Sequence, residues 1–185
     1  LTFATIYALQ NWLQICDRLG RTDQQAYWQQ AIDEMRVATN THFWHDRWFG
    51  RGITDAGRLF GIDGDVEGAI FLNPQTWAML SHSVSAEQQT NMLESVTRHL
   101  ETAYGVELVA PAFTHMHEDI GRVTQKFPGT AENGSVYNHA AAFYIYALYS
   151  IGEADRAFTL IRKMVPGLDP EDLSQRGQLP NYIPN

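Results

Sequence analysis

The residues that could do chemistry gather in a polar stretch that ends at His139. Glu132 supplies a carboxylate to this stretch and His139 supplies an imidazole, just ahead of an apolar helix predicted at residues 140–151. The glycines on either side of Glu132 permit tight turns or a close approach of the backbone to a ligand. The first N–H groups of a helix lack partners and the helix dipole is positive there, so an anion is favoured beside His139. The pattern predicts a polar pocket wall with an anion-binding corner, although an ordinary capped helix after a loop has the same pattern.

Two cations, Arg122 and Lys126, precede this stretch in a chain whose formal net charge is −8. Two cations that converge on a pocket would bind a carboxylate or a phosphate through charge-assisted hydrogen bonds. Two solvated surface charges would have the same spacing. The sequence leaves both interpretations open.

Aromatic and amide side chains offer a second kind of site. Trp44, Trp48 and Trp77, together with Gln75, could form a platform on which a sugar ring stacks while the amide binds its hydroxyl groups. Core packing is the alternative, and for any single tryptophan it is the stronger one.

Neither of the acidic and histidine clusters predicts a metal site. Residues 63–68 have acids at the first, third and fifth positions and glycine at the sixth, as in the first half of a calcium loop. The twelfth position, which should be a bidentate glutamate, is Pro74. His115 and His117 stand one residue apart in a loop without cysteines, which is a poor match to zinc spacing. An acidic turn and a solvated or substrate-lining loop are the expected structures.

Length and composition limit the classes of protein to which the chain can belong. The 185 residues are enough for one domain with a real core. The negative charge argues against a nucleic-acid partner, and no apolar run is long enough to span a membrane. Cys16, the single cysteine, is predicted to pack in the core. Nucleophile elbows, phosphate loops and dinucleotide fingerprints are absent from the sequence.

Apolar residues at helical spacing predict paired helices. Asp23 and Ser85 are expected to cap the second and fourth of them. Residues 43–72 are predicted to form loops and short strands, and residues 105–137 a long polar loop. Short and long connections therefore alternate, which favours an all-α fold, a partial (α/α)6 toroid with long loops on one rim; a plain helix bundle is the alternative. The helices are predicted at residues 1–19, 24–38, 73–80, 86–104, 140–151 and 153–165.

Two motifs resemble a known family. Residues 67–77 (EGAIFLNPQTW) and 128–140 (PGTAENGSVYNHA) are similar to the catalytic barrel of glycoside hydrolase family 94, the inverting disaccharide phosphorylases. The resemblance covers most of the chain. It implies an (α/α)6 barrel and cleavage of a β-linked disaccharide by inorganic phosphate to an α-sugar 1-phosphate. Phosphate is then a substrate, and no cofactor or metal is expected.

The resemblance also implies roles for individual residues. His139 would contact phosphate and Glu132 would bind sugar, and Gln75 and Gln178 join the predicted substrate-binding residues. Phosphate itself attacks the anomeric carbon while one general acid protonates the leaving oxygen, so a second catalytic carboxylate is unnecessary. The family's general-acid aspartate would precede Leu1, so no catalytic residue is predicted in this chain.

The resemblance also implies which acceptor sugar would bind. Cellobiose- and chitobiose-type members tend to have lysine directly before the glutamate, where this chain has Ala131. Arg122 and Lys126 look like the pair with which members acting on cellobionic acid bind the acceptor carboxylate. The predicted reaction is cellobionic acid plus phosphate to glucose 1-phosphate plus gluconate. Open alternatives are a cellobiose-, laminaribiose- or chitobiose-type phosphorylase, a cyclic glucan synthase-like region, a toroid hydrolase and a non-catalytic carbohydrate-binding fragment.

The same resemblance suggests how the chain is organised. Residues 1–185 are expected to be a fragment of one catalytic domain, without the N-terminal part of the barrel and an N-terminal β domain. Such a fragment is expected to be inactive alone. The longer protein is expected to act in the cytoplasm. A homodimer is its expected assembly, and a disaccharide and phosphate are its expected partners, with neither nucleic acid nor membrane.

Overall fold

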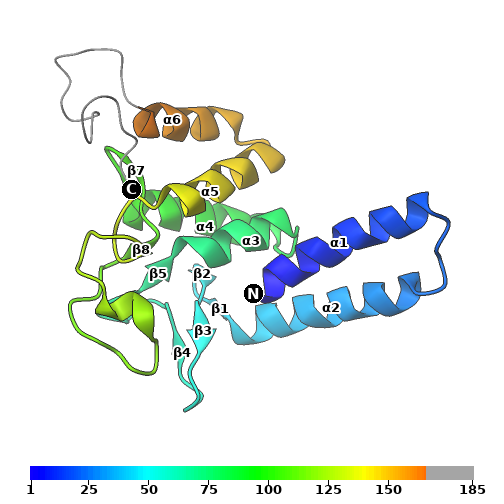
Figure 1. The fold of residues 1–185 in the computed structure, drawn as a ribbon, viewed down its shortest axis with the longest axis horizontal. Coiled ribbons are helices and arrows are strands. Elements are labelled where there is room, and N and C mark those ends of the chain that lie inside the picture. Colours follow the sequence, from blue (N-terminus) through cyan, green and yellow to red (C-terminus); the bar gives the residue numbers. More distant parts are fainter. Residues whose placement is uncertain (166–185) are drawn as a thin grey trace.

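Six α-helices alternate in direction along residues 1–165, the part of the chain that the computed structural model describes (Figure 1). Helices α1, α3 and α5 run one way, and α2, α4 and α6 return beside them (Figure 1). The result is three antiparallel helix pairs in a row, which confirms the predicted helical character of the chain. The helices are α1 (Thr2–Arg18), α2 (Gln25–His42), α3 (Leu72–Leu80), α4 (Ala86–His99), α5 (Asn138–Ser150) and α6 (Ala154–Met164).

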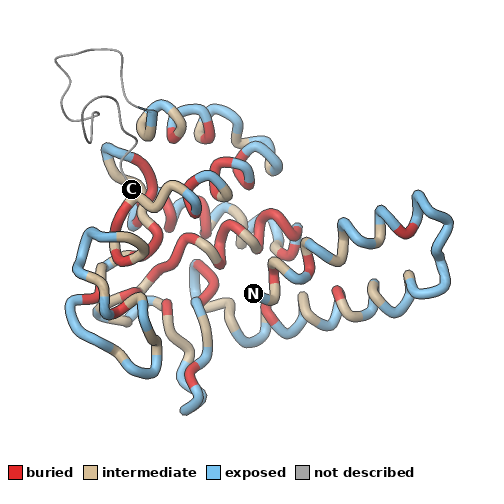
Figure 2. The backbone as a smooth tube through the Cα atoms, viewed as in Figure 1, coloured by how far each residue is buried: buried red, intermediate tan, exposed pale blue. Residues whose placement is uncertain are grey.

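Helix α3 is the centre of the core. It contacts α1 on one side and α5 on the other, and α5 in turn contacts α6. Both α3 and α5 are apolar almost all round, so burial on several sides is what their sequences favour. The rings of Tyr144, which belongs to α5, and Phe49 are fully buried. Figure 2 shows the buried backbone concentrated in this central region, whereas the far ends of α1 and α2 are largely exposed.

Short strands brace the long connections between the helix pairs. They pair as four two-stranded antiparallel ladders within residues 1–165. The ladder of β5 with β8 matters most, because it joins the connection before α3 to the connection before α5, with Ile70 opposite Ala110 and Phe71 opposite Val109. The pairs are β1 (Trp44–His45) with β2 (Trp48–Phe49), β3 (Gly52–Ile53) with β4 (Leu59–Phe60), β5 (Ile70–Phe71) with β8 (Val109–Ala110), and β6 (Glu101–Thr102) with β7 (Gly105–Val106).

The predicted helix ends are confirmed at one cap and wrong at three places, one of which is the end of α2, at His42 rather than at residue 38. Ser85 caps α4 as predicted: its hydroxyl accepts the Gln88 N–H at 3.2 Å, and the Gln88 side chain accepts the Ser85 N–H at 2.9 Å. Asp23 does not cap α2, whose N-cap is Gln24 without a side-chain bond, because a backbone turn from Gln25 N–H to Thr22 already closes this end. Helix α4 ends at His99 rather than near residue 104, since the β6–β7 hairpin follows and folds the chain back to bury Val106.

Cys16 is buried, as predicted. Within residues 1–165, no helix has the combination of length and apolar character that crossing a bilayer requires.

Candidate functional site

The N-terminal ends of α1, α3 and α5 face the same side of the molecule. The two long connections, residues 43–71 and 100–137, gather on that side, and we call them the loop rim (Figure 1). Because parallel helices present the positive ends of their dipoles together, this side favours negatively charged ligands.

His139 lies in the first turn of α5, where the sequence placed the anion-binding corner. Its side chain is exposed, and Tyr137, the N-cap residue, makes no side-chain cap bond. Within residues 1–165, no hydrogen bond to the imidazole is found, and its ring packs edge-on against Phe143 at a centroid distance of 5.0 Å. The imidazole nitrogens are therefore available to a ligand at the loop rim.

Lys126 and Glu132 are brought together by a turn. The ammonium of Lys126 forms an ion pair with the Glu132 carboxylate, and the two side chains are 37% and 36% exposed. The turn between them is closed by a hydrogen bond of 2.8 Å from the Gly129 N–H to the Asn133 carbonyl. A predicted acceptor-binding cation and a predicted sugar-binding carboxylate are thus direct neighbours.

Arg122 opens a short 3-10 helix, η1 (Arg122–Gln125), one turn before Lys126. Its side chain is exposed, and no carboxylate of residues 1–165 pairs with it. An unpaired guanidinium can bind an incoming carboxylate without first losing an acidic partner of its own.

Gln75 was predicted to contact the sugar, but its side chain is fully buried. Its amide oxygen accepts the Phe49 N–H at 3.0 Å, and its amide nitrogen donates to the carbonyls of Phe49 at 2.9 Å and Phe71 at 3.0 Å. Every polar atom of this side chain is used to join β2 to α3. We therefore assign Gln75 to the fold and leave it out of the site.

The three tryptophans do not form one platform. Trp48 is buried, and its indole N–H donates to the Gly61 and Ala69 carbonyls at 3.0 and 3.1 Å. Trp44 packs edge-on against Phe49. For these two the core-packing alternative describes the structure.

Trp77 alone reaches a cavity. It lines a space of about 490 Å³ at the N-terminal ends of α1 and α3, together with Arg51, Asn73 and Thr39. The Trp77 ring stands 5.2 Å from that of Phe143, which is itself next to His139, so a row of aromatic rings connects this cavity with the anion-binding corner. A wider groove of about 900 Å³ follows the outer face of α2 and contains none of the predicted site residues.

Arg51, which lines the same cavity as Trp77, was not predicted from the sequence as a site residue. Its guanidinium lies 5.7 Å from the centroid of the Phe71 ring, and partial burial lowers its pKa. Flanking glycines were the available signal. A Cβ at Gly50 would come within 2.8 Å of the Leu59 side chain, and one at Gly52 within 2.9 Å of the Phe60 ring, so both side chains pack closely against the backbone that flanks Arg51.

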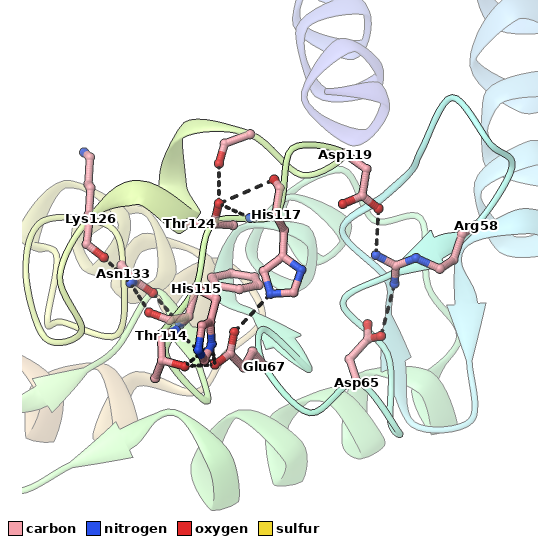
Figure 3. A network of polar contacts seen from close by, with 12 residues as sticks. Arg58, Asp65, Glu67, Thr114, His115, His117, Asp119, Thr124, Lys126 and Asn133 are labelled. Atoms are coloured by element: carbon pink, nitrogen blue, oxygen red, sulfur yellow. Dashed lines mark hydrogen bonds and ion pairs between the residues drawn. The ribbon is translucent and has the colours of Figure 1, made fainter.

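Acidic residues of the loop rim pair with neighbouring loops (Figure 3). Asp65 accepts the Gly61 and Ile62 N–H groups at 2.8 and 3.2 Å, and Arg58 bridges it to Asp119. No cluster suited to a metal ion occurs among residues 1–165. The calcium-like segment is an acidic turn that caps its own backbone.

Glu67 ties the two halves of the loop rim together. Its carboxylate accepts the hydroxyl and, at 2.9 Å, the N–H of Thr114, and lies 3.1 Å from Nε2 of His117. The bond from the Thr114 hydroxyl is the largest influence on the pKa of Glu67; with the bonds from His117 and the Thr114 N–H it outweighs burial and lowers this pKa to about 2.

One predicted residue, Gln178, lies outside the described residues 1–165.

The sequence of the chain is similar to those of known proteins. A model of the glycosyl hydrolase 94 superfamily catalytic domain matches residues 1–183. The whole chain is 50% identical to a cellobionic acid phosphorylase of Neurospora crassa and 34% identical to a 3-O-beta-D-glucopyranosyl-beta-D-glucuronide phosphorylase of Paenibacillus borealis, covering 24% of each. Over 90% of its length it is 31% identical to an N,N'-diacetylchitobiose phosphorylase of Vibrio proteolyticus, covering 21% of that protein. The chain thus spans about a quarter of the length of these relatives.

Proposed function

Since the chain belongs to the glycosyl hydrolase 94 superfamily, we propose that it is part of an inverting phosphorylase that converts cellobionic acid and phosphate into glucose 1-phosphate and gluconate. The helix pairs would form one section of an (α/α)6 toroid, and the loop rim would form part of its active site. The longer enzyme would act in the cytoplasm, and a homodimer is its proposed assembly.

The exposed cations Arg122 and Lys126 are the observation that carries the acidic acceptor. They lie on one short segment of the loop rim, and Arg122 has no acidic partner among residues 1–165. A gluconate carboxylate needs such charge-assisted hydrogen bonds, whereas a neutral sugar does not. Two of the relatives are named for acid-bearing disaccharides, which supports the same assignment.

The proposed mechanism uses phosphate as the nucleophile. His139 and the positive end of the α5 dipole would hold the phosphate dianion beside the anomeric carbon. A phosphate oxygen forms the new bond to that carbon as the glycosidic C–O bond breaks. A general acid outside this chain gives its proton to the leaving oxygen of gluconate. The configuration inverts because attack comes from the face opposite to the leaving group.

Glu132 would accept hydrogen bonds from sugar hydroxyl groups. Its carboxylate pairs with the ammonium of Lys126. Binding of an acidic acceptor would therefore redistribute this ammonium between Glu132 and the acceptor carboxylate. Placing Lys126 between two carboxylates keeps it oriented in both states.

A neutral acceptor is the second candidate, and the Lys126–Glu132 pair is the observation that favours it. If this pair persists in the complex, only Arg122 remains for an acceptor charge. The N,N'-diacetylchitobiose phosphorylase relative is consistent with that alternative.

The reaction class is tested with the full-length protein that contains this chain. Cellobionate is incubated with and without phosphate, and the products are identified by phosphorus and proton NMR. We expect cleavage only with phosphate, with α-glucose 1-phosphate as the first product. Release of free glucose at the same rate without phosphate would contradict the proposal and favour a hydrolase. The 185-residue chain alone is expected to show no turnover.

A further inference from the structure

Glu67 makes a long-range clamp across the loop rim. It stands just before β5, and its partners Thr114 and His117 follow 47 and 50 residues later. Its side chain is only 16% exposed. The neighbouring Gly68 fits closely beneath the same segment: its N–H donates to the Pro111 carbonyl at 2.7 Å, and a Cβ here would overlap the Phe113 ring.

The Glu67 carboxylate determines which ring nitrogen of His115 and of His117 donates a hydrogen bond. An ionised carboxylate only accepts hydrogen bonds, so Nε2 of His117 carries the proton that points at Glu67. The Thr114 hydroxyl gives its single proton to Glu67, so its oxygen accepts from Nδ1 of His115 at 2.7 Å. One carboxylate therefore organises three side chains of the second loop.

From His117 the network continues to the segment with the cations. The backbone N–H of His117 donates to the Thr124 hydroxyl at 2.8 Å. This hydroxyl donates to the Gly121 carbonyl at 2.9 Å. Thr124 is buried inside η1, whose first residue is Arg122. The position of Arg122 thus depends on His117, and through it on Glu67.

The other end of the segment is held by Asn133, which is fully buried. Its side-chain nitrogen donates to the carbonyls of Phe113 at 2.8 Å and Lys126 at 2.7 Å, and its oxygen accepts the Phe113 N–H at 2.8 Å. Phe113 immediately precedes the clamped Thr114. Both cation-bearing ends are consequently tied to the short stretch that Glu67 holds.

We propose that Glu67 is a positioning residue for the acidic acceptor: by clamping residues 114–117 it sets the relative placement of Arg122 and Lys126, without itself touching the substrate. Figure 3 shows the Glu67 carboxylate on the far side of the network from the Lys126 ammonium. This inference rests on the proposed function, because it assigns the clamp to the acceptor half of that reaction.

The test compares Glu67→Gln with Glu118→Gln in the full-length protein, in the synthetic direction. Glu118 is an exposed acid of the same loop for which no hydrogen bond or ion pair occurs within residues 1–165, so E118Q removes the same charge without disturbing the clamp. We expect E67Q to raise the KM for gluconate about tenfold, the effect of losing roughly one charge-assisted hydrogen bond at the cations. The KM for glucose 1-phosphate should stay within about twofold, and E118Q should match the wild type in both constants.

Hydrogen exchange of the loop gives a readout independent of activity. The backbone amides of Thr114 and His117 should exchange faster in E67Q than in E118Q or the wild type. Unchanged exchange together with an unchanged gluconate KM would overturn the positioning role. An equal rise in both KM values would also overturn it, since a clamp for the acceptor half acts on one substrate.

Two further outcomes keep the inference separate from the proposed function. A wild-type enzyme that uses only neutral acceptors contradicts the acid-acceptor proposal, while the amide exchange rates still decide whether Glu67 holds the loop. If E67Q fails to fold, Thr114→Val removes the hydroxyl bond to Glu67, together with the bond from His115 to the same hydroxyl, and leaves the Glu67 carboxylate in place. Faster exchange at His117 in T114V would then support the clamp, and wild-type exchange would overturn it.

Discussion

Lys126 and Glu132 form an ion pair across the turn at Gly129, on the side of the molecule where three helix N-termini meet. Each side chain is more than one-third exposed, and ion pairs of this kind contribute only about 0–1 kcal/mol to stability. The proximity of these two charges therefore matters chiefly for what binds between or beside them.

Lys126→Met and Glu132→Gln should separate stability from activity. We expect either change to alter the free energy of unfolding by less than about 1 kcal/mol. Each should reduce kcat/KM of the full-length enzyme with its sugar substrates by at least about tenfold, because each removes a charged ligand-binding group. Asp33→Asn, which breaks the exposed pair of Asp33 with Arg36 on α2, is the matched control and should leave activity unchanged. Activity losses equal to that of the control would remove both residues from the site.

Arg122→Ala should discriminate between acceptors. Loss of its guanidinium should lower kcat/KM for gluconate by about 10- to 100-fold, the range of one or two charge-assisted hydrogen bonds. The KM for glucose 1-phosphate should change less than about threefold. Arg21→Ala, an exposed cation in the turn between α1 and α2, is the control. An equal loss with neutral and acidic acceptors would argue against a carboxylate contact.

Gln75→Ala should act through stability. The change leaves the N–H and carbonyl of Phe49 without their buried partner, which should destabilise the protein by about 3 kcal/mol in denaturant titrations. Gln14→Ala on the exposed face of α1 should change stability by less than about 0.5 kcal/mol. A Gln75→Ala protein of wild-type stability but raised sugar KM would restore the sugar-contact hypothesis.

Glu67 should leave a signature in acid unfolding. The pKa of its carboxyl is lowered from 4.5 to about 2 in the folded protein, so the unfolded state binds the proton first as the pH falls. The stabilisation from this group is complete above pH 4.5 or so and is lost as the pH falls toward about 2. The free energy of unfolding of Glu67→Gln should therefore fall less steeply than that of the wild type across this window. Parallel curves for the two proteins would show that Glu67 is not held as described.

The helices follow from the sequence because their causes are local. Apolar residues at helical spacing and the Ser85 capping box lie within a few residues of the structure they specify. Asp23 shows the limit of such reasoning, since a carboxylate before a helix is a cap only if the backbone has not already satisfied the same groups. The end of α4 depended on burial of Val106 in a hairpin, which no local pattern of the helix contains.

The site residues show the same difference between local and long-range causes. The position of His139 at a helix start was predictable because a helix start is a local feature, and its phosphate contact stays a prediction. Gln75 was not, because its role is decided by Phe49, 26 residues away in sequence. Arg51 and Glu67 owe their importance to loops that meet only in the folded chain, and the resemblance to a family gave no substitute for those contacts.

The acceptor selectivity of the full-length enzyme decides whether the site binds an acidic acceptor. Glucose 1-phosphate is offered with gluconate, glucose or N-acetylglucosamine, and the initial rate of phosphate release is measured for each. We predict phosphate release with gluconate at a kcat/KM at least about tenfold above that with either neutral sugar, because Arg122 and Lys126 would both bind the gluconate carboxylate. Release that is as fast with glucose would contradict the acid-acceptor site, and no release with any of the three would contradict the phosphorylase itself.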